Sequence, residues 1–142
     1  MSQHFQSIET ARTFALAGNA TLTISSLKTG ARFTYRVKQA CDSETKKPRP
    51  GMYFVSLLNG PDNENDYCYL GMVRDGRFTL TRASKAGNEA PSVKAFAFFM
   101  TTPILHPQME IRHEGKCGRC GRTLTIPESI DAGIGPECIK MM

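Results

Sequence analysis

The stretch ATLTISSLKTGARFTYRVKQ, residues 20–39, predicts a β-hairpin. It consists of two alternating segments separated by the turn sequence Lys28-Thr-Gly30. Because successive side chains of a strand point to opposite sides, the second segment has one apolar and one basic face. The apolar face holds Phe33, Tyr35 and Val37, and the other face holds Arg32, Thr34, Arg36 and Lys38. We expect the apolar face to pack against the core.

Patterns on both sides of this hairpin predict an α+β domain over residues 1–111. Helices are expected at residues 7–17, capped by Ser7, and from Pro91 or Ser92 to Met100. Further strands are expected at residues 52–58, 67–74, 77–81 and, as a short final strand, 108–112. The segment 52–58 alternates little, so we expect it to be central and covered on both faces. The prediction is an antiparallel sheet of about five strands packed by two helices.

Length and composition exclude several classes of protein. A chain of 142 residues with 40% hydrophobic and 22% charged residues fits one globular domain, or one domain with a small appendage. No apolar run approaches the 18 or more residues of a membrane span, and the N-terminal sequence does not resemble a secretory signal. Five cysteines without secretion do not suggest a disulfide framework. We therefore expect a cytoplasmic protein without a membrane partner.

The positive charge of the chain is concentrated in one segment. The net charge is +5, and residues 28–49 alone carry seven basic side chains against Asp42 and Glu44, which is also +5. Part of this segment, residues 40–51, has the composition of an exposed, mobile loop. Such a concentration favours an acidic partner, either nucleic acid or an acidic host protein.

The C-terminal residues carry the ligand pattern of a zinc site. His113 is followed after three residues by the pair Cys117-x2-Cys120, and Cys138 comes further on. Two thiolates of one tight turn, a third thiolate and an imidazole give the Cys3His composition of structural zinc. Pro136 is well placed to begin a short helix that carries Cys138, which would give a treble-clef-like arrangement. We predict a Zn²⁺-binding module at residues 112–142, docked on the sheet domain.

Several alternatives to this ligand set stay open. Cys68, Cys41 and His106 compete with His113 as the fourth ligand, and His113 itself could be a solvated side chain at a strand end. Redox chemistry of the Cys117-x2-Cys120 pair is less favoured, because no βαβ pattern surrounds it. A catalytic zinc is also less favoured, because four protein ligands close the site to substrate.

Residues 113–138, with the sequence HEGKCGRCGRTLTIPESIDAGIGPEC, resemble an uncharacterised zinc-finger-like family found in phage, plasmid and other bacterial proteins. The resemblance implies metal ligation by Cys117, Cys120 and Cys138, with His113 at the matching upstream position. It also implies an origin in a mobile element, and it implies no activity. The order of strands and of the helix in residues 1–111 is, in addition, similar to that of WGR domains, although the chain has no tryptophan.

These observations favour a non-enzymatic binding protein. The hypothesis is nucleic-acid binding through a basic hairpin face, the loop that follows it and the metal knuckle: Lys28, Arg32, Arg36, Lys38, Lys46, Lys47, Arg49, Arg119 and Arg122. The alternatives are an inhibitor that binds a host protein, a solvated sheet face on a structural scaffold, and an enzyme. No catalytic motif or small-molecule substrate site is evident, and residues 59–66 resemble a calcium loop in composition only.

Overall fold

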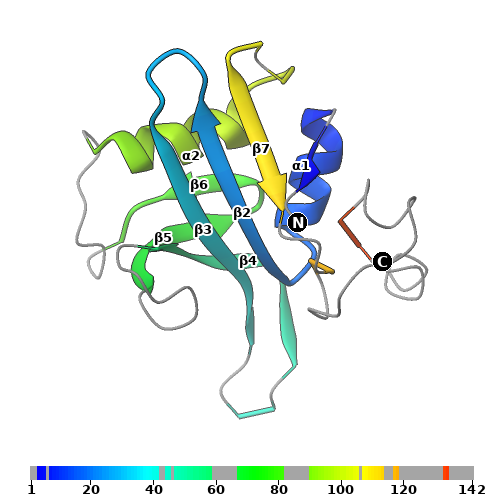
Figure 1. The fold of residues 1–142 in the computed structure, drawn as a ribbon. Helices are drawn as coiled ribbons and strands as arrows, with labels where there is room; N and C mark the ends of the chain where they lie inside the picture. The colour runs from blue at the N-terminus through cyan, green and yellow to red at the C-terminus, as the bar shows by residue number, and fades with distance from the viewer. Residues whose placement is uncertain are drawn as a thin grey trace.

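One antiparallel sheet organises the chain (Figure 1). The computed structural model describes residues 3–5, 7–41, 44–45, 47–58, 67–81, 90–105, 107–113, 117–118 and 133–134. The strands are β1 (Gln3–His4), β2 (Asn19–Ser26), β3 (Arg32–Cys41), β4 (Pro48–Leu58), β5 (Tyr67–Arg74), β6 (Arg77–Thr79) and β7 (Met109–His113). The helices are α1 (Ile8–Ala15) and α2 (Pro91–Thr101). The strand order is β1-β7-β2-β3-β4-β5-β6, so the fold class is α+β, as predicted.

The predicted hairpin is confirmed as β2 and β3. The two strands pair from Asn19 opposite Lys38 to Ser25 opposite Arg32. The inner residues of both strands are buried except Phe33, which is partly buried, while Arg32 and Lys38 are exposed. β7 pairs with the other edge of β2, which places the C-terminal strand beside the hairpin. The period of two in the sequence is therefore the period of burial in the structure.

Two sequence-based expectations about the sheet were wrong. The sheet has seven strands rather than about five, or six when the two-residue β1 is set aside. β1 is too short to have a recognisable pattern. The segment 40–51 is not a loop throughout, because β3 continues to Cys41 and pairs with Pro48 at the start of β4. β3 and β4 thus project together beyond the sheet (Figure 1).

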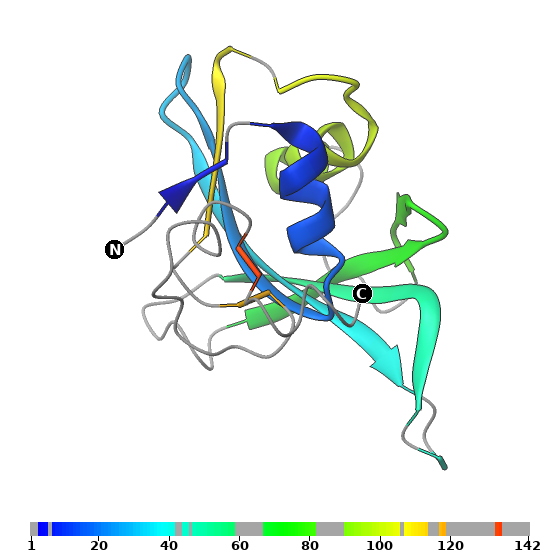
Figure 2. The same cartoon turned by 90° about the vertical axis from the view of Figure 1, so that its right-hand side faces the viewer.

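Both helices lie on the concave side of the curled sheet, as Figure 2 shows. α1 begins after Ser7, whose hydroxyl accepts a hydrogen bond from the Glu9 amide at 3.2 Å, so the predicted cap is confirmed. The Arg12 side chain of α1 donates to the carbonyl oxygens of Phe99 and Thr102 at the end of α2. These bonds satisfy terminal carbonyl groups of α2 and join the two helices.

Aromatic side chains fill the space between α2 and the sheet. The Phe96 ring is fully buried, with its centroid 5.0 Å from that of Tyr35 and 4.8 Å from that of Phe78. The Tyr35 hydroxyl donates a buried hydrogen bond of 2.6 Å to the Ser92 carbonyl oxygen in the first turn of α2. Burial also raises the pKa of Tyr35 above its ordinary value. β3 and α2 are thus held together by both apolar packing and a buried polar contact.

Among the residues that the structure describes, no helix is long and apolar enough to cross a lipid bilayer.

Candidate nucleic-acid interface and metal centre

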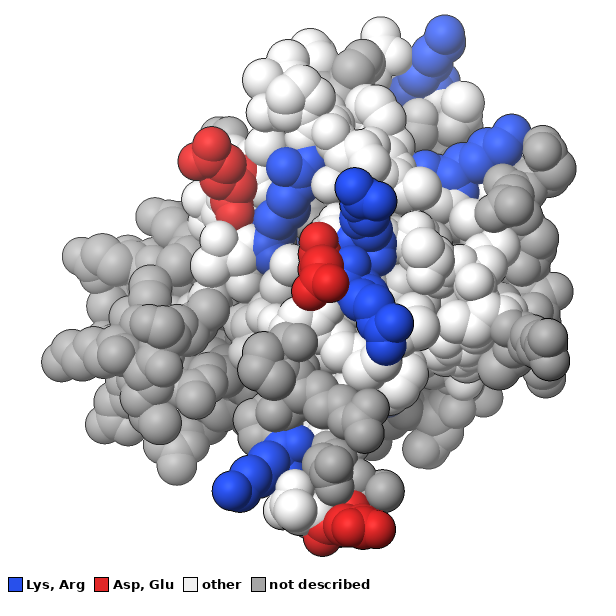
Figure 3. Space-filling model, turned by 180° about the vertical axis from the view of Figure 1, so that it is seen from behind, with Lys and Arg blue, Asp and Glu red and all other residues white. Residues whose placement is uncertain are grey.

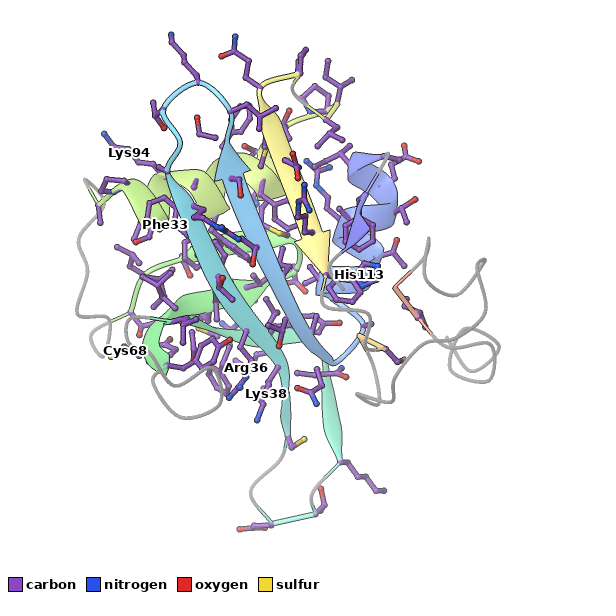
Figure 4. The ribbon with its side chains drawn as sticks, in the orientation of Figure 1. Phe33, Arg36, Lys38, Cys68, Lys94 and His113 are labelled. Carbon is purple, nitrogen blue, oxygen red and sulfur yellow. The ribbon has the colours of Figure 1, made fainter. Side chains whose placement is uncertain are left out.

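The convex side of the sheet, turned away from both helices, presents a surface that we call the outer face. Its described members on β2 to β5 include Thr21, Thr23, Arg32, Thr34, Arg36, Lys38, Phe54, Ser56, Tyr67 and Tyr69, and the register of β4 with β5 adds Met72 and Arg74. Arg36 and Lys38 follow one another along β3 in Figure 4. Alternate residues of a strand are about 6–7 Å apart, so three cations of β3 form a spaced row. Hydroxyl groups flank that row, including Thr23 and Thr34, whose Oγ1 atoms are 2.9 Å apart.

A β-bulge in β5 brings two tyrosines to the outer face. Val55 pairs with Gly71, but its neighbour Ser56 pairs with Tyr69, which leaves Leu70 as an extra residue. Without that residue, Tyr67 and Tyr69 would share the inner face with the fully buried Val73. A Cβ atom on Gly71 would lie 2.7 Å from the Thr79 carbonyl oxygen and 2.8 Å from a Phe78 ring carbon. A glycine at this position therefore allows the close approach of β6.

The aromatic rings of the outer face lie among its cations. The Arg36 guanidinium carbon is 4.0 Å from the centroid of the Tyr67 ring, a cation–π contact. Phe54, directly opposite Lys38, is 44% exposed, and its ring packs edge-on against Tyr69 at 6.1 Å. The Tyr69 hydroxyl is 3.0 Å from Thr81 Oγ1, which fixes the tyrosine ring. The outer face thus combines positive charge, hydroxyl groups and an accessible aromatic ring.

Sequence reasoning missed this aromatic component. β4 was expected to be covered on both faces, and the exposure of Phe54 shows that prediction to be wrong. β4 is central in the sheet, but both helices pack on its concave side. The alternation of Tyr67 and Tyr69 placed them on one common face, but only the bulge decides which one.

The other predicted basic residues lie elsewhere. Lys28 is in the turn between β2 and β3 and lines a cleft beside α2 rather than extending the row on β3. Lys47 is exposed at the tip of the β3–β4 hairpin, and the backbone of Arg49 lies in β4. Lys46, Arg119 and Arg122 lie outside the described residues, as does the calcium-like stretch 59–66.

Charges on the outer face and on the helix-bearing side are arranged differently. β7 adds Glu110 and Arg112 to the outer face, where they form an ion pair with each other, so the excess positive charge among the described residues of this face comes from the β3 cations and from Arg74 on β5. On the helix-bearing side, several of the described Lys and Arg side chains gather in the middle of the view around one acidic side chain, and others lie toward its edge (Figure 3). The outer face is therefore characterised by cations that lie beside hydroxyl groups and an exposed aromatic ring, rather than by charge alone.

His113 and Gly118 both lie against the ring of Phe14. His113 is 1% exposed at the end of β7, and its ring centroid lies 5.4 Å from that of Phe14 and 5.1 Å from that of Phe5. The structure therefore excludes the alternative of a solvated His113. Cys117 is likewise 1% exposed, and a Cβ atom on Gly118 would lie 2.7 Å from a Phe14 ring carbon.

Backbone hydrogen bonds attach the described tail residues to the sheet. The Gly118 amide donates to the Gly133 carbonyl at 2.8 Å, and the Gly118 carbonyl accepts from the Asn19 amide at 2.7 Å. Ile134 is 2% exposed and belongs to the same core as α1. The predicted boundary between residues 111 and 112 falls within β7, which belongs to the sheet.

Part of the predicted ligand set lies beyond the described residues. Cys120, Cys138 and the competing ligand His106 are outside them, and within the described part no group of three metal-ligating side chains is brought together. Cys68 and His113 lie on opposite sides of the molecule in Figure 4, so Cys68 is not a fourth ligand beside Cys117 and His113. Cys41 is exposed on the projecting end of β3. His113 and Cys117 are the two predicted ligands that are described and buried: His113 contacts the Phe14 ring, and Cys117 precedes Gly118, which lies against the same ring.

The family of unknown function DUF6011 matches residues 108–142. The match begins just before β7 and spans all four predicted metal ligands. It agrees with the expectation of an uncharacterised module at this end of the chain, and it covers less than half of the residues. No curated protein and no solved structure matches the chain.

Proposed function

We propose that the protein binds single-stranded nucleic acid on its outer face. The observation that carries this proposal is the position of Phe54, a 44% exposed aromatic ring directly opposite Lys38 in the neighbouring strand. Proteins that bind single strands combine cations that follow the phosphate backbone with aromatic rings on which bases stack. The outer face has both within one pair of strands.

Each component of the outer face has a role in this proposal. Arg36 and Lys38, at alternate positions of β3, are spaced to neutralise neighbouring phosphates, and Arg32, four residues before Arg36, reaches a phosphate further along the strand. Phe54 stacks on a base, a contact worth about 1–3 kcal/mol per base. The stacked Arg36 guanidinium is oriented by Tyr67, at 4.0 Å from the ring centroid, so it presents its donors in a fixed direction.

A single strand suits this surface better than a duplex. Bases inside a duplex are stacked on one another and do not offer their faces to Phe54. The row of cations also lies on strands of a sheet rather than on a helix that would enter a major groove. The proposal includes a cytoplasmic, non-enzymatic role in a phage or plasmid context.

Fluorescence anisotropy with labelled single-stranded DNA, single-stranded RNA and duplex DNA, each across a salt series, tests the proposal. We expect tighter binding of a single strand than of the duplex. For the combined variant Arg32→Glu, Arg36→Glu and Lys38→Glu, we expect complete loss of binding. Phe54→Ser should weaken single-strand binding by about 1–3 kcal/mol.

Lys94→Glu on α2 serves as the matched control, because it reverses an exposed lysine on the helix-bearing side. It should leave single-strand affinity within about twofold, since no phosphate contact is lost. Absence of binding at low salt, or equal losses from Lys38→Glu and Lys94→Glu, would contradict the proposal. If Phe54→Ser binds every oligonucleotide with the affinity of the wild type, Phe54 does not stack on a base and only the cations contribute to binding.

We further propose that His113, Cys117, Cys120 and Cys138 hold a structural Zn²⁺. The burial of both His113 and Cys117 supports this donor set, because a buried thiol and a buried imidazole from a short stretch of chain suit a closed four-ligand site. When bound, zinc supplies folding free energy to a segment with too few apolar residues for a core of its own.

Elemental analysis of the purified protein tests the metal proposal. We expect about one zinc per chain, a loss of most of that zinc in Cys120→Ser, and loosening of the tail under limited proteolysis. Cys41→Ser is the matched control, since Cys41 is exposed on β3 and should be dispensable. Full zinc retention in Cys120→Ser would exclude that residue as a ligand.

A further inference from the structure

A cleft of about 460 Å³ lies beside α2, between the end of the β2–β3 hairpin and the beginning of β7. Its lining is mostly apolar and includes Phe33, Ala95, Phe98 and Met109. Phe33 and Lys94 lie close together at this end of the molecule in Figure 4. Neither the predicted zinc site nor the outer face uses this cleft.

The charged residues among the described lining of the cleft, Lys28 and Lys94, are both basic. Lys28 reaches it from the hairpin turn and Lys94 from α2, and no Asp or Glu is among its described lining residues. Both lysines are exposed, and Lys94 lies one helical turn before Phe98 on the same side of α2. An apolar floor with positive charge contributed by two separate elements is complementary to an apolar group that has anionic neighbours.

We propose that this cleft binds a segment of a partner protein in which apolar anchor side chains are flanked by Asp or Glu. The anchors would fill the space between Phe33 and Phe98, and the carboxylates would pair with Lys28 and Lys94. Recognition of short segments by buried anchors in a groove, with charge selecting among them, is a recurrent mode of peptide binding.

The exposure of Phe98 favours a peptide over a small molecule. Phe98 is 44% exposed although it lines the cleft, so an apolar surface continues from the cleft onto the side of α2. Sites for small molecules enclose most of the ligand. A peptide with two or more anchors covers both the cleft and the exposed part of Phe98, and thus removes more apolar surface from water.

The proposal is independent of nucleic-acid binding. Lys94 belongs to α2 on the concave side of the sheet, whereas Lys38 belongs to the outer face. If one surface does not bind its proposed ligand, the variants of the other surface still test that surface separately. Substitution of Lys38 is the control for peptide binding, and substitution of Lys94 is the control for nucleic-acid binding.

Selection of peptides from a random phage-displayed library against the full chain tests whether Lys28 and Lys94 favour acidic residues beside the apolar anchors. Parallel selections use the double variant Lys28→Glu/Lys94→Glu and, as a matched control, Lys38→Glu/Lys47→Glu, which reverses two exposed lysines elsewhere. We expect apolar anchors flanked by Asp or Glu for the wild type and the control. For the Lys28→Glu/Lys94→Glu protein we expect the flanking residues to change to Lys or Arg.

Binding of one selected acidic peptide, measured by calorimetry, tests the location. Phe98→Asp should weaken it at least tenfold. Leu27→Asp, at a 61% exposed leucine that does not line the cleft, should leave affinity within twofold. Circular dichroism must show that each variant is folded, and the reversals at exposed lysines give a second test if Phe98→Asp is not.

Three results would overturn the proposal. The first is a selection that enriches no peptides, or enriches peptides without an excess of Asp and Glu. The second is an excess of Asp and Glu that persists in the Lys28→Glu/Lys94→Glu protein, and the third is an equal loss of peptide affinity in Phe98→Asp and Leu27→Asp. Dodecanoate binding that depends on Phe98, without any peptide that binds, would also overturn it and identify the cleft as a site for a small amphipathic anion.

Discussion

Phe54 and Phe98 are each 44% exposed and each lies near a lysine, but their surroundings differ. Phe54 lies on the outer face, among cations, hydroxyl groups and the ring of Tyr69. Phe98 lies on the concave side and borders an apolar cleft with Lys94 at its edge. Exposure of an aromatic ring therefore does not indicate a ligand by itself, whereas its neighbours do. A row of cations beside an exposed aromatic ring favours a nucleic acid, whose phosphates pair with the cations and whose bases stack on the ring. An apolar cleft favours the apolar side chain of a peptide.

The largest expected effect is a loss of stability on substituting the buried side of α2, compared with its exposed side. Phe96→Ala should lower the free energy of unfolding by about 3–5 kcal/mol, because the fully buried Phe96 packs against Tyr35, Phe78 and Phe99. Phe98→Ala, at a 44% exposed position of the same helix, should cost less than about 1 kcal/mol. Chemical denaturation measures both. A cost at Phe98 equal to that at Phe96 would show that Phe98 is a core residue rather than part of a binding surface.

The next effect concerns the bulge that supports the outer face. Gly71→Ala should destabilise the protein by about 1–3 kcal/mol, because the new Cβ would approach the Thr79 carbonyl oxygen at 2.7 Å. It should also weaken single-strand binding, since Tyr67 and Tyr69 depend on the bulge for their side of the sheet. Peptide binding to the cleft should change less. Denaturation and the two binding assays check this, and unchanged stability would contradict the strain inferred at Gly71.

High pH should affect both surfaces through Tyr35, whose hydroxyl joins β3 to α2. Burial raises the pKa of Tyr35 above its ordinary value of 10.0, so the folded state keeps the hydroxyl neutral while the unfolded state ionises. This contribution to stability is fully present below pH 10 and is lost as the pH rises above it, by up to about 1.4 kcal/mol per pH unit. Burial raises the pKa of Tyr53 as well, so part of the slope should remain in Tyr35→Phe.

Denaturation at a series of pH values between neutral and alkaline compares the wild type with Tyr35→Phe. The wild type should lose stability more steeply above pH 10 than the variant does. Parallel slopes for the two proteins would show that the Tyr35 hydroxyl does not control this loss.

The smallest expected effect is a change in salt dependence. Lys38→Ala should reduce the slope of log affinity against log salt by about 0.7 for a single strand, which corresponds to one phosphate contact. Lys94→Ala should leave that slope unchanged, because Lys94 is on the other side of the sheet. Anisotropy titrations at several salt concentrations measure both slopes. Equal slopes for Lys38→Ala and the wild type would remove Lys38 from the interface.

Local patterns in the sequence determined the hairpin, the cap of α1 and the row of cations on β3. These features follow from period-two alternation, a hydroxyl residue before a helix and the turn sequence at Lys28-Thr-Gly30, each of which acts over a few residues. The spacing of cysteines likewise predicts a metal module, and the family match covers the same segment. The ligand set itself stays a prediction.

Tertiary structure alone decided which side chains share a surface. One extra residue at Leu70 moved Tyr67 and Tyr69 to the outer face, and such a shift depends on how β5 pairs with β4 and β6. The packing of both helices on one side of the sheet exposed Phe54, and the end of the hairpin and α2 formed the cleft with Phe98. These arrangements depend on contacts between residues far apart in the chain, which a local pattern does not encode.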